Sequence, residues 1–185
     1  MKPAFYARPT LDVAAELIGK VLVHDGVGML LRGDVCLIVY QKAARIERTR
    51  WLFDVLDAAL DDNERCLLGL MIVLDTSDPP DGPTRQENHF RLRKIERRVK
   101  RLVTTPVGDA FKLSVVRAVM RGLNIVLGNS GTRFITDTVD EGVTQLLEAK
   151  TRETPPRQQI LTDLRAIYIA LGEPDPKFSE VRAAS

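Results

Sequence analysis

Two predicted loops carry side chains that could do chemistry. Each loop follows an apolar run typical of a buried strand, and together they contain Asp75, Thr76, Ser77, Gly108 and Asp109. Open α/β sheets bind ligands at the carboxyl ends of parallel strands, so these residues could line a pocket for a ligand or a partner. The alternative is that the same residue types cap helices and form turns.

A basic segment, residues 85–101, indicates a second kind of site. On one helix, the three- and four-residue spacing of its cations predicts a single stripe that could meet phosphates or an acidic partner. The stripe consists of Arg91, Lys94, Arg98 and Arg101. Glu87 and Glu96 could balance these charges on a solvated face, and no aromatic side chain is interleaved to stack on bases. Nucleic-acid binding through this helix is therefore an alternative that we do not favour.

The remaining candidate residues predict no catalytic centre. Cys36 and Cys66 lack the spacing of a metal site and are expected to be buried free thiols. His24 and His89 have no neighbouring carboxylate or second histidine and are expected at the surface. Residues 128–132 lack the order of a phosphate-binding loop and are expected to form a tight turn. We expect no metal, no cofactor and no enzymatic activity.

The composition is that of a soluble globular protein. The 185 residues are 44% hydrophobic and 28% charged. Because 27 Lys+Arg face 25 Asp+Glu, the net charge is only +2, and a nucleic-acid or membrane-surface role would need a local patch. No apolar run approaches the roughly 20 residues that span a bilayer, and residues 1–5 lack the apolar stretch of a secretory signal. We expect a cytoplasmic protein that does not bind membranes.

Apolar runs alternate with amphipathic segments along the chain. The expected strands are residues 20–24, 29–31, 35–40, 67–74, 102–107 and 133–136. The expected helices are residues 10–18, 46–60, 84–100, 113–123, 138–147 and 158–171. This order favours an α/β fold with a mostly parallel sheet and packed helices. In the helix at 84–100, the apolar contacts are expected from Phe90, Leu92, Ile95 and Val99.

The same pattern suggests three segments. Residues 1–28 are expected to form an N-terminal helix–strand extension, and residues 29–150 the α/β domain. Residues 151–185 are expected to contain a linker, a docking helix with an apolar stripe, and a tail.

The order of elements from residue 35 to residue 147 resembles STAS-like domains, named for sulfate transporters and anti-sigma-factor antagonists. Residues 103–109, a following apolar helix, and residues 132–137 and 141–147 carry the resemblance. Such domains are generally non-enzymatic regulators, and the antagonists are switched by phosphorylation in a loop entering a helix. Residues 72–77 are similar to the strand leading to that loop, although residues 78–82 replace the antagonists' Asp-Ser-Ser-Gly. The resemblance implies a regulatory or protein-interaction module with an unidentified protein partner.

A second, shorter resemblance lies near the start of the chain. Residues 5–11 and 17–23 are similar to the opening of alkyladenine (3-methyladenine) DNA glycosylases, which flip a base and use a glutamate to activate water. In that family the glutamate lies on the next strand. Here residues 35–40 contain no carboxylate, so the resemblance implies a DNA-repair relative that lacks the catalytic acid.

Overall fold

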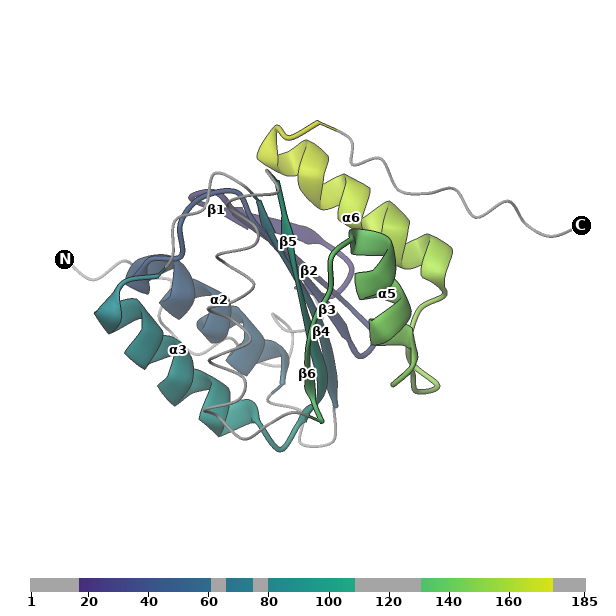
Figure 1. Cartoon of the computed structure of the whole chain (residues 1–185), viewed down its shortest axis with the longest axis horizontal. Helices are drawn as coiled ribbons and strands as arrows, with labels where there is room; N and C mark the ends of the chain where they lie inside the picture. The colour runs from purple at the N-terminus through teal and green to yellow at the C-terminus, as the bar shows by residue number, and fades with distance from the viewer. Residues whose placement is uncertain (1–16, 61–65, 75–79, 109–130, 175–185) are drawn as a thin grey trace, which may run out of the picture.

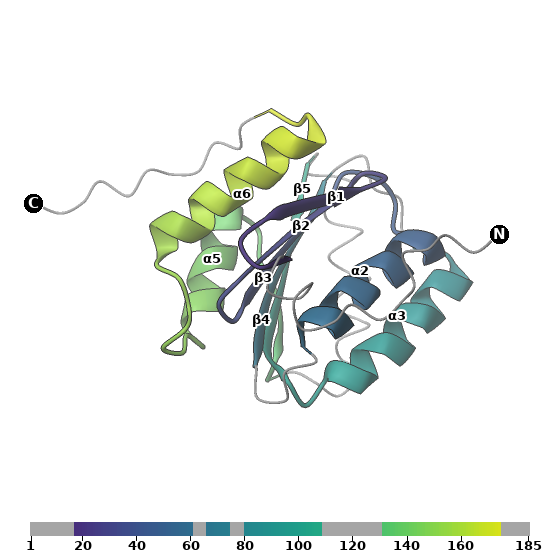
Figure 2. The ribbon, with the colours of Figure 1, turned by 180° about the vertical axis from the view of Figure 1, so that it is seen from behind.

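The computed structural model describes residues 17–60, 66–74, 80–108 and 131–174 of the chain. These residues form a six-stranded sheet with a pair of helices on each face (Figure 1, Figure 2). The predicted α/β fold with packed helices is therefore confirmed. None of the helices in these ranges is long and apolar enough to cross a membrane.

The first two strands of the sheet form a hairpin with a two-residue turn. Strands β1 (Val21–His24) and β2 (Val27–Arg32) are antiparallel, and the turn residues Asp25 and Gly26 have φ angles of 44° and 79°. A type I′ turn needs positive φ at both central positions, and Asp-Gly is one of the pairs that adopt it most readily. These two residues therefore form the turn that their residue types favour.

The parallel part of the sheet starts at the third strand. β3 (Val35–Tyr40), β4 (Leu67–Leu74), β5 (Val99–Val107) and β6 (Arg133–Ile135) run parallel, and the strand order follows the chain from β1 to β6. All six residues of β3 are buried. A strand covered on both faces needs no polar alternation, which is why continuous apolar runs predicted β3 and β4.

Helices α2 (Ile46–Ala59) and α3 (Gly82–Ile95) lie on one side of the sheet. α2 buries Leu52, Phe53 and Leu56 in an apolar cluster with side chains of β2, β3 and β4. α3 packs on α2, farther from the sheet, as Figure 1 and Figure 2 both show. One face of α3 therefore meets α2, and its opposite face points away from the body of the protein.

Helices α5 (Val139–Leu147) and α6 (Arg157–Leu171) cover the other face. α5 packs on β4 and β5, whereas α6 packs on β1, β2 and β3. Their apolar side chains share one core cluster with the sheet, in which Val143, Leu146, Ile160, Leu164 and Ile167 are all 0% exposed. The docking predicted from the apolar stripe of the last helix is confirmed.

The expected helix at residues 84–100 is too long. α3 ends at Ile95, residues 96–98 form a turn, and β5 begins at Val99 instead of residue 102. Val99 pairs with Leu67 of β4, and the Leu67 N–H donates to the Arg98 carbonyl at 2.8 Å. Residues 96–101 are good helix formers apart from Val99, so the hydrogen-bond ladder with β4 overrides their local preference.

Two other expected elements fall wholly or mostly outside the described residues. These are the helix at 10–18, of which the described part begins at residue 17, and the helix at 113–123. β1 and β2 belong to the same sheet as β3–β6, and α6 shares the core of that sheet. The described parts of 1–28 and 151–185 thus pack in one body with the predicted domain at 29–150.

Candidate interaction surface

The structure describes one residue of the predicted pocket at the carboxyl ends of the strands. Gly108 directly follows β5 with a φ of 150°, a backbone region that favours glycine. Asp75, Thr76, Ser77 and Asp109 lie outside the described residues. The pocket therefore stays a prediction.

At this end of the sheet, a polar contact joins β5 to the connection between β6 and α5. The hydroxyls of Thr105 and Thr136 lie 2.6 Å apart and are buried. A Cβ at Gly142 would lie 2.6 Å from the Thr105 hydroxyl oxygen, so glycine lets α5 approach the sheet closely. Thr138 caps α5 by accepting from the Glu141 N–H, and Glu141 accepts from the Asp137 N–H in return. These residues serve helix formation and packing.

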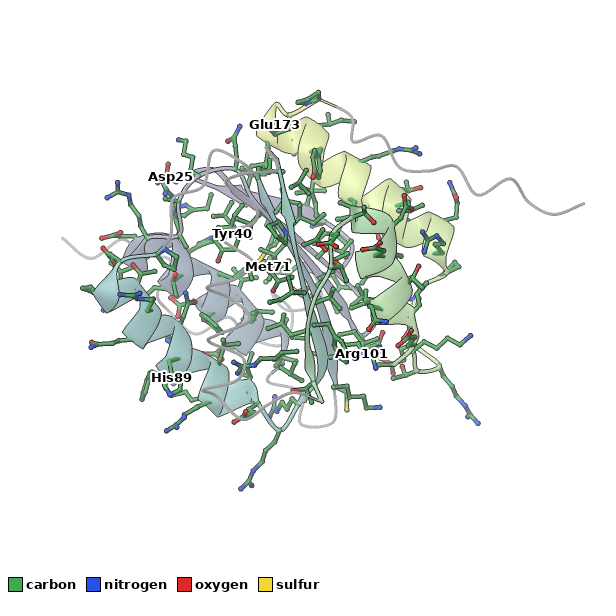
Figure 3. All side chains as sticks on the ribbon, viewed as in Figure 1. Asp25, Tyr40, Met71, His89, Arg101 and Glu173 are labelled. Carbon is green, nitrogen blue, oxygen red and sulfur yellow. The ribbon has the colours of Figure 1, made fainter. Side chains whose placement is uncertain are left out.

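The four cations of the predicted basic stripe do not share one helix face. Arg91 and Lys94 belong to α3, but Arg98 lies in the turn after it and Arg101 lies on β5. Figure 3 shows His89 on α3 at one side of the molecule and Arg101 at the sheet, towards α5. The single stripe was wrong because it required a helix that continues to residue 101.

Arg91 connects α3 to α2. Its guanidinium forms ion pairs with Asp54 at 3.1 Å, Asp57 at 3.0 Å and Glu87 at 3.1 Å. Asp54 and Asp57 belong to α2, while Glu87 lies one turn earlier on α3. A planar guanidinium with five N–H groups can serve several carboxylates at once. Arg91 is therefore a packing residue, directed inward.

Arg98 and Arg101 also bind within the protein. Arg98 donates to the carbonyl of Leu60, directly after the end of α2. Arg101 donates to the Gln145 carbonyl at 2.5 Å and to Glu148 at 2.8 Å, and it lies over the Phe134 ring at 4.4 Å. A cation near the carbonyl end of a helix also complements the helix dipole. Both arginines join the sheet or its connections to neighbouring helices.

Several cations reach solvent together on the outer face of α3. The name "outer face of α3" stands for six exposed side chains of α3 and of the turn that follows it: Arg85, Gln86, Phe90, Arg93, Lys94 and Arg97. Glu96, which is also exposed, is not counted in it. Thr84 and Ile95, on the opposite side of the helix, are buried. Of the four predicted patch residues, only Lys94 belongs to this surface.

Phe90 lies at the middle of the outer face and is 56% exposed. The Lys94 ammonium lies 4.5 Å from the centre of its ring. The expectation that Phe90 makes an inward contact was wrong, because its ring lies on the exposed face beside Lys94. A helical turn of 3.6 residues places Phe90 about 140° around the axis from Ile95. The spacing of these two residues was therefore a usable signal.

The outer face carries excess positive charge. Within residues 85–97, Glu96 is the exposed acid among four exposed basic residues, which are Arg85, Arg93, Lys94 and Arg97. Among the described residues, no carboxylate forms an ion pair with Arg93, Lys94 or Arg97. Unpaired surface cations around an aromatic ring can attract an acidic group and then gain contact area from the ring.

The cysteines and histidines lie away from this surface, apart from His89. Burial raises the pKa of the Cys36 thiol to about 12, which keeps it protonated and unreactive at neutral pH. Cys66 is half-buried and also free, so the expected burial holds for Cys36 alone. His24 is exposed and stacks on Trp51 at a ring distance of 5.1 Å. The described residues contain no group of three or more side chains arranged to hold a metal ion.

The chain was compared with protein-family models, curated proteins and solved structures. No protein-family model, curated protein or solved structure matches the chain.

Proposed function

We propose that this chain is a cytoplasmic, non-enzymatic regulatory module that binds another protein through the outer face of α3. The observation that carries the proposal is the division of the basic residues between two roles. Internal contacts bind Arg91, Arg98 and Arg101. The exposed ring of Phe90, in contrast, lies among Arg93, Lys94 and Arg97.

Interface composition supports this choice. Aromatic residues and arginine are enriched in protein–protein interfaces, and anchors of these types contribute most of the binding free energy. Phe90 supplies apolar area, and the cations around it can speed association with an oppositely charged partner. The contacts of Arg91 to α2 hold the helix in place, so little ordering of this helix would be needed on binding.

The regulatory role in this proposal comes from the resemblance to STAS-like domains. The described elements from β3 to α5 fit part of the order on which that resemblance rests, and the apolar helix expected at residues 113–123 lies outside the described residues. The glycosylase alternative is less well supported, because β3 carries no carboxylate and all of its residues are buried. Incubation with duplex DNA containing alkyladenine or hypoxanthine tests it, and base release would overturn our choice.

Site-specific crosslinking tests the proposed function. Gln86, on the outer face of α3, is replaced by a photo-crosslinking amino acid in the full chain expressed in its native cells. The control chain carries the same amino acid in place of Thr162, an exposed residue of α6. We expect a protein adduct from position 86 that is absent from position 162.

A matched pair of substitutions makes the crosslinking result specific. Phe90→Ser removes an exposed apolar side chain from α3, and Ile169→Ser removes one that is 70% exposed on α6. We expect Phe90→Ser to abolish the adduct and Ile169→Ser to leave it unchanged. The proposal is wrong if both positions give the same adducts, if none forms, or if Phe90→Ser leaves the adduct intact.

A further inference from the structure

The contact between α2 and α3 illustrates what kind of surface α3 accepts. On its inner side, Arg91 meets Asp54 and Asp57, two carboxylates that lie three residues apart on α2. Residues three or four apart on a helix are neighbours on one face. A helix that presents two carboxylates one turn apart is therefore a surface that α3 already binds within this chain.

The outer face repeats this arrangement without an occupant among the described residues. Arg93 and Arg97 are four residues apart, and Phe90 and Lys94 form a parallel pair with the same spacing. Arg97 lies in the turn directly after α3, so the Arg93–Arg97 row continues from the last turn of the helix into that turn. Beside the Phe90–Lys94 row it gives a ridge of side chains against which a second helix can pack. Arg93 and Arg97 would meet carboxylates, while Phe90 would meet an apolar side chain.

We propose that the partner bound by the outer face of α3 presents an acidic helix with carboxylates one turn apart beside an apolar side chain. This inference rests on the proposed function and adds the chemistry of the partner. It is carried by the spacing of the unpaired cations, the exposure of Phe90 and the precedent of α2.

An acidic protein segment fits this surface better than a nucleic acid. The Lys94 ammonium lies over the Phe90 ring, so a base could stack there only by displacing it. A helix with discrete carboxylates can place them at Arg93 and Arg97 without displacing the Lys94 ammonium from the ring.

Fluorescence anisotropy with the full chain tests the inference. The probe is a labelled, glutamate-rich helical peptide with leucines one turn apart, compared with a version in which serine replaces the leucines. A version with glutamine in place of glutamate is the third peptide, and single- and double-stranded DNA are the fourth and fifth probes. We expect binding of the first peptide, and affinities about tenfold or more lower for the other four probes.

Charge exchange shows where the peptide binds. The double variant R93E/R97E should weaken the acidic peptide about tenfold or more, and should bind a lysine-for-glutamate version of the peptide more tightly than the parent chain does. Arg152→Glu changes the charge of another exposed arginine, between α5 and α6, and should leave the affinity unchanged. All three positions are exposed, so both variants should fold like the parent chain, and circular dichroism checks this.

Each result decides between the two proposals. Binding of DNA tighter than that of the acidic peptide, no peptide binding, or equal effects of Arg152→Glu and R93E/R97E would overturn the acidic-helix inference. If a protein adduct still forms at position 86 in a Phe90-dependent way, the proposed function stands and only the chemistry of the partner is wrong. If no adduct forms, the proposed function itself fails.

Discussion

At the scale of single residues, side chains of one type have different roles according to which element faces them. Arg91 and Arg93 are two positions apart, yet Arg91 holds two carboxylates of α2 and Arg93 is exposed. Arg48 differs from both, because it is 7% exposed and ties α2 to the β1–β2 turn through Asp25. Formal charge alone therefore does not identify a binding residue.

The Asp25 carboxylate should make stability depend on pH in the acid range. Hydrogen bonds from Arg48 and then from Lys42 hold its pKa below the ordinary value of 3.8. Because the folded-state pKa is depressed, the stabilisation is present above the unfolded pKa and is lost as the pH falls through the folded one. We expect Asp25→Asn to be less stable than the parent at neutral pH, with a difference that shrinks below about pH 4.

Urea unfolding across this pH range measures the effect. Asparagine is tolerated at positive φ, so the turn at Asp25 should persist in the variant. A difference between parent and variant that stays constant down to the lowest pH would contradict the assignment of this carboxylate.

At the scale of elements, glycine determines how closely α6 lies on the sheet. A Cβ on Gly28 of β2 would lie 2.5 Å from Cγ2 of Ile167, which is fully buried on α6. A nearby ion pair joins the same two elements, since Arg32 of β2 contacts Asp163 of α6 at 2.6 Å and Asp163 is buried. The helix cannot move away from the added methyl without disturbing that pair.

Gly28→Ala should therefore destabilise the fold by about 1–3 kcal/mol, the range typical of overpacking. Gly82→Ala is the matched control, because a Cβ there meets nothing within 4 Å. Thermal unfolding of the two variants distinguishes close packing from a general effect of replacing glycine. Equal melting temperatures for both variants would contradict the close approach of α6.

At the scale of the whole molecule, the sheet has an apolar core on each face. The core on the α5 and α6 face contains Leu164, which is 0% exposed, whereas Ile169 on the same helix is 70% exposed. In the connection between α5 and α6, Thr151 and Thr154 both donate to the buried Asp34 carboxylate. The C-terminal helix is thus part of the fold and not an accessory to it.

Leu164→Ala should lower the free energy of unfolding by about 2–5 kcal/mol, because it removes buried methyl groups and leaves a cavity. Ile169→Ala should change it by less than about 0.5 kcal/mol, as expected for an exposed position. Chemical denaturation of both variants is the measurement. Similar small losses would mean that α6 does not cover the sheet as described.

The sequence by itself determined the elements whose signals are local. Continuous apolar runs predicted β3 and β4 with their observed bounds, and Asp25-Gly26 is a local pair that favours the first hairpin turn. The helix predicted at residues 138–147 also begins with a local signal, because Thr138 and Glu141 have the spacing of a capping box. Each of these signals arises within a few consecutive residues, so no distant contact is needed to interpret it.

Only the tertiary structure decided which basic residues reach solvent. α3 stops at Ile95 because residues after it gain a hydrogen-bond ladder with β4, which separates Arg98 and Arg101 from the helix. The carboxylates that hold Arg91 inward lie 34 and 37 residues earlier in the chain. Burial and charge pairing depend on contacts between distant residues, and these contacts leave Phe90, Arg93, Lys94 and Arg97 exposed together on the outer face of α3.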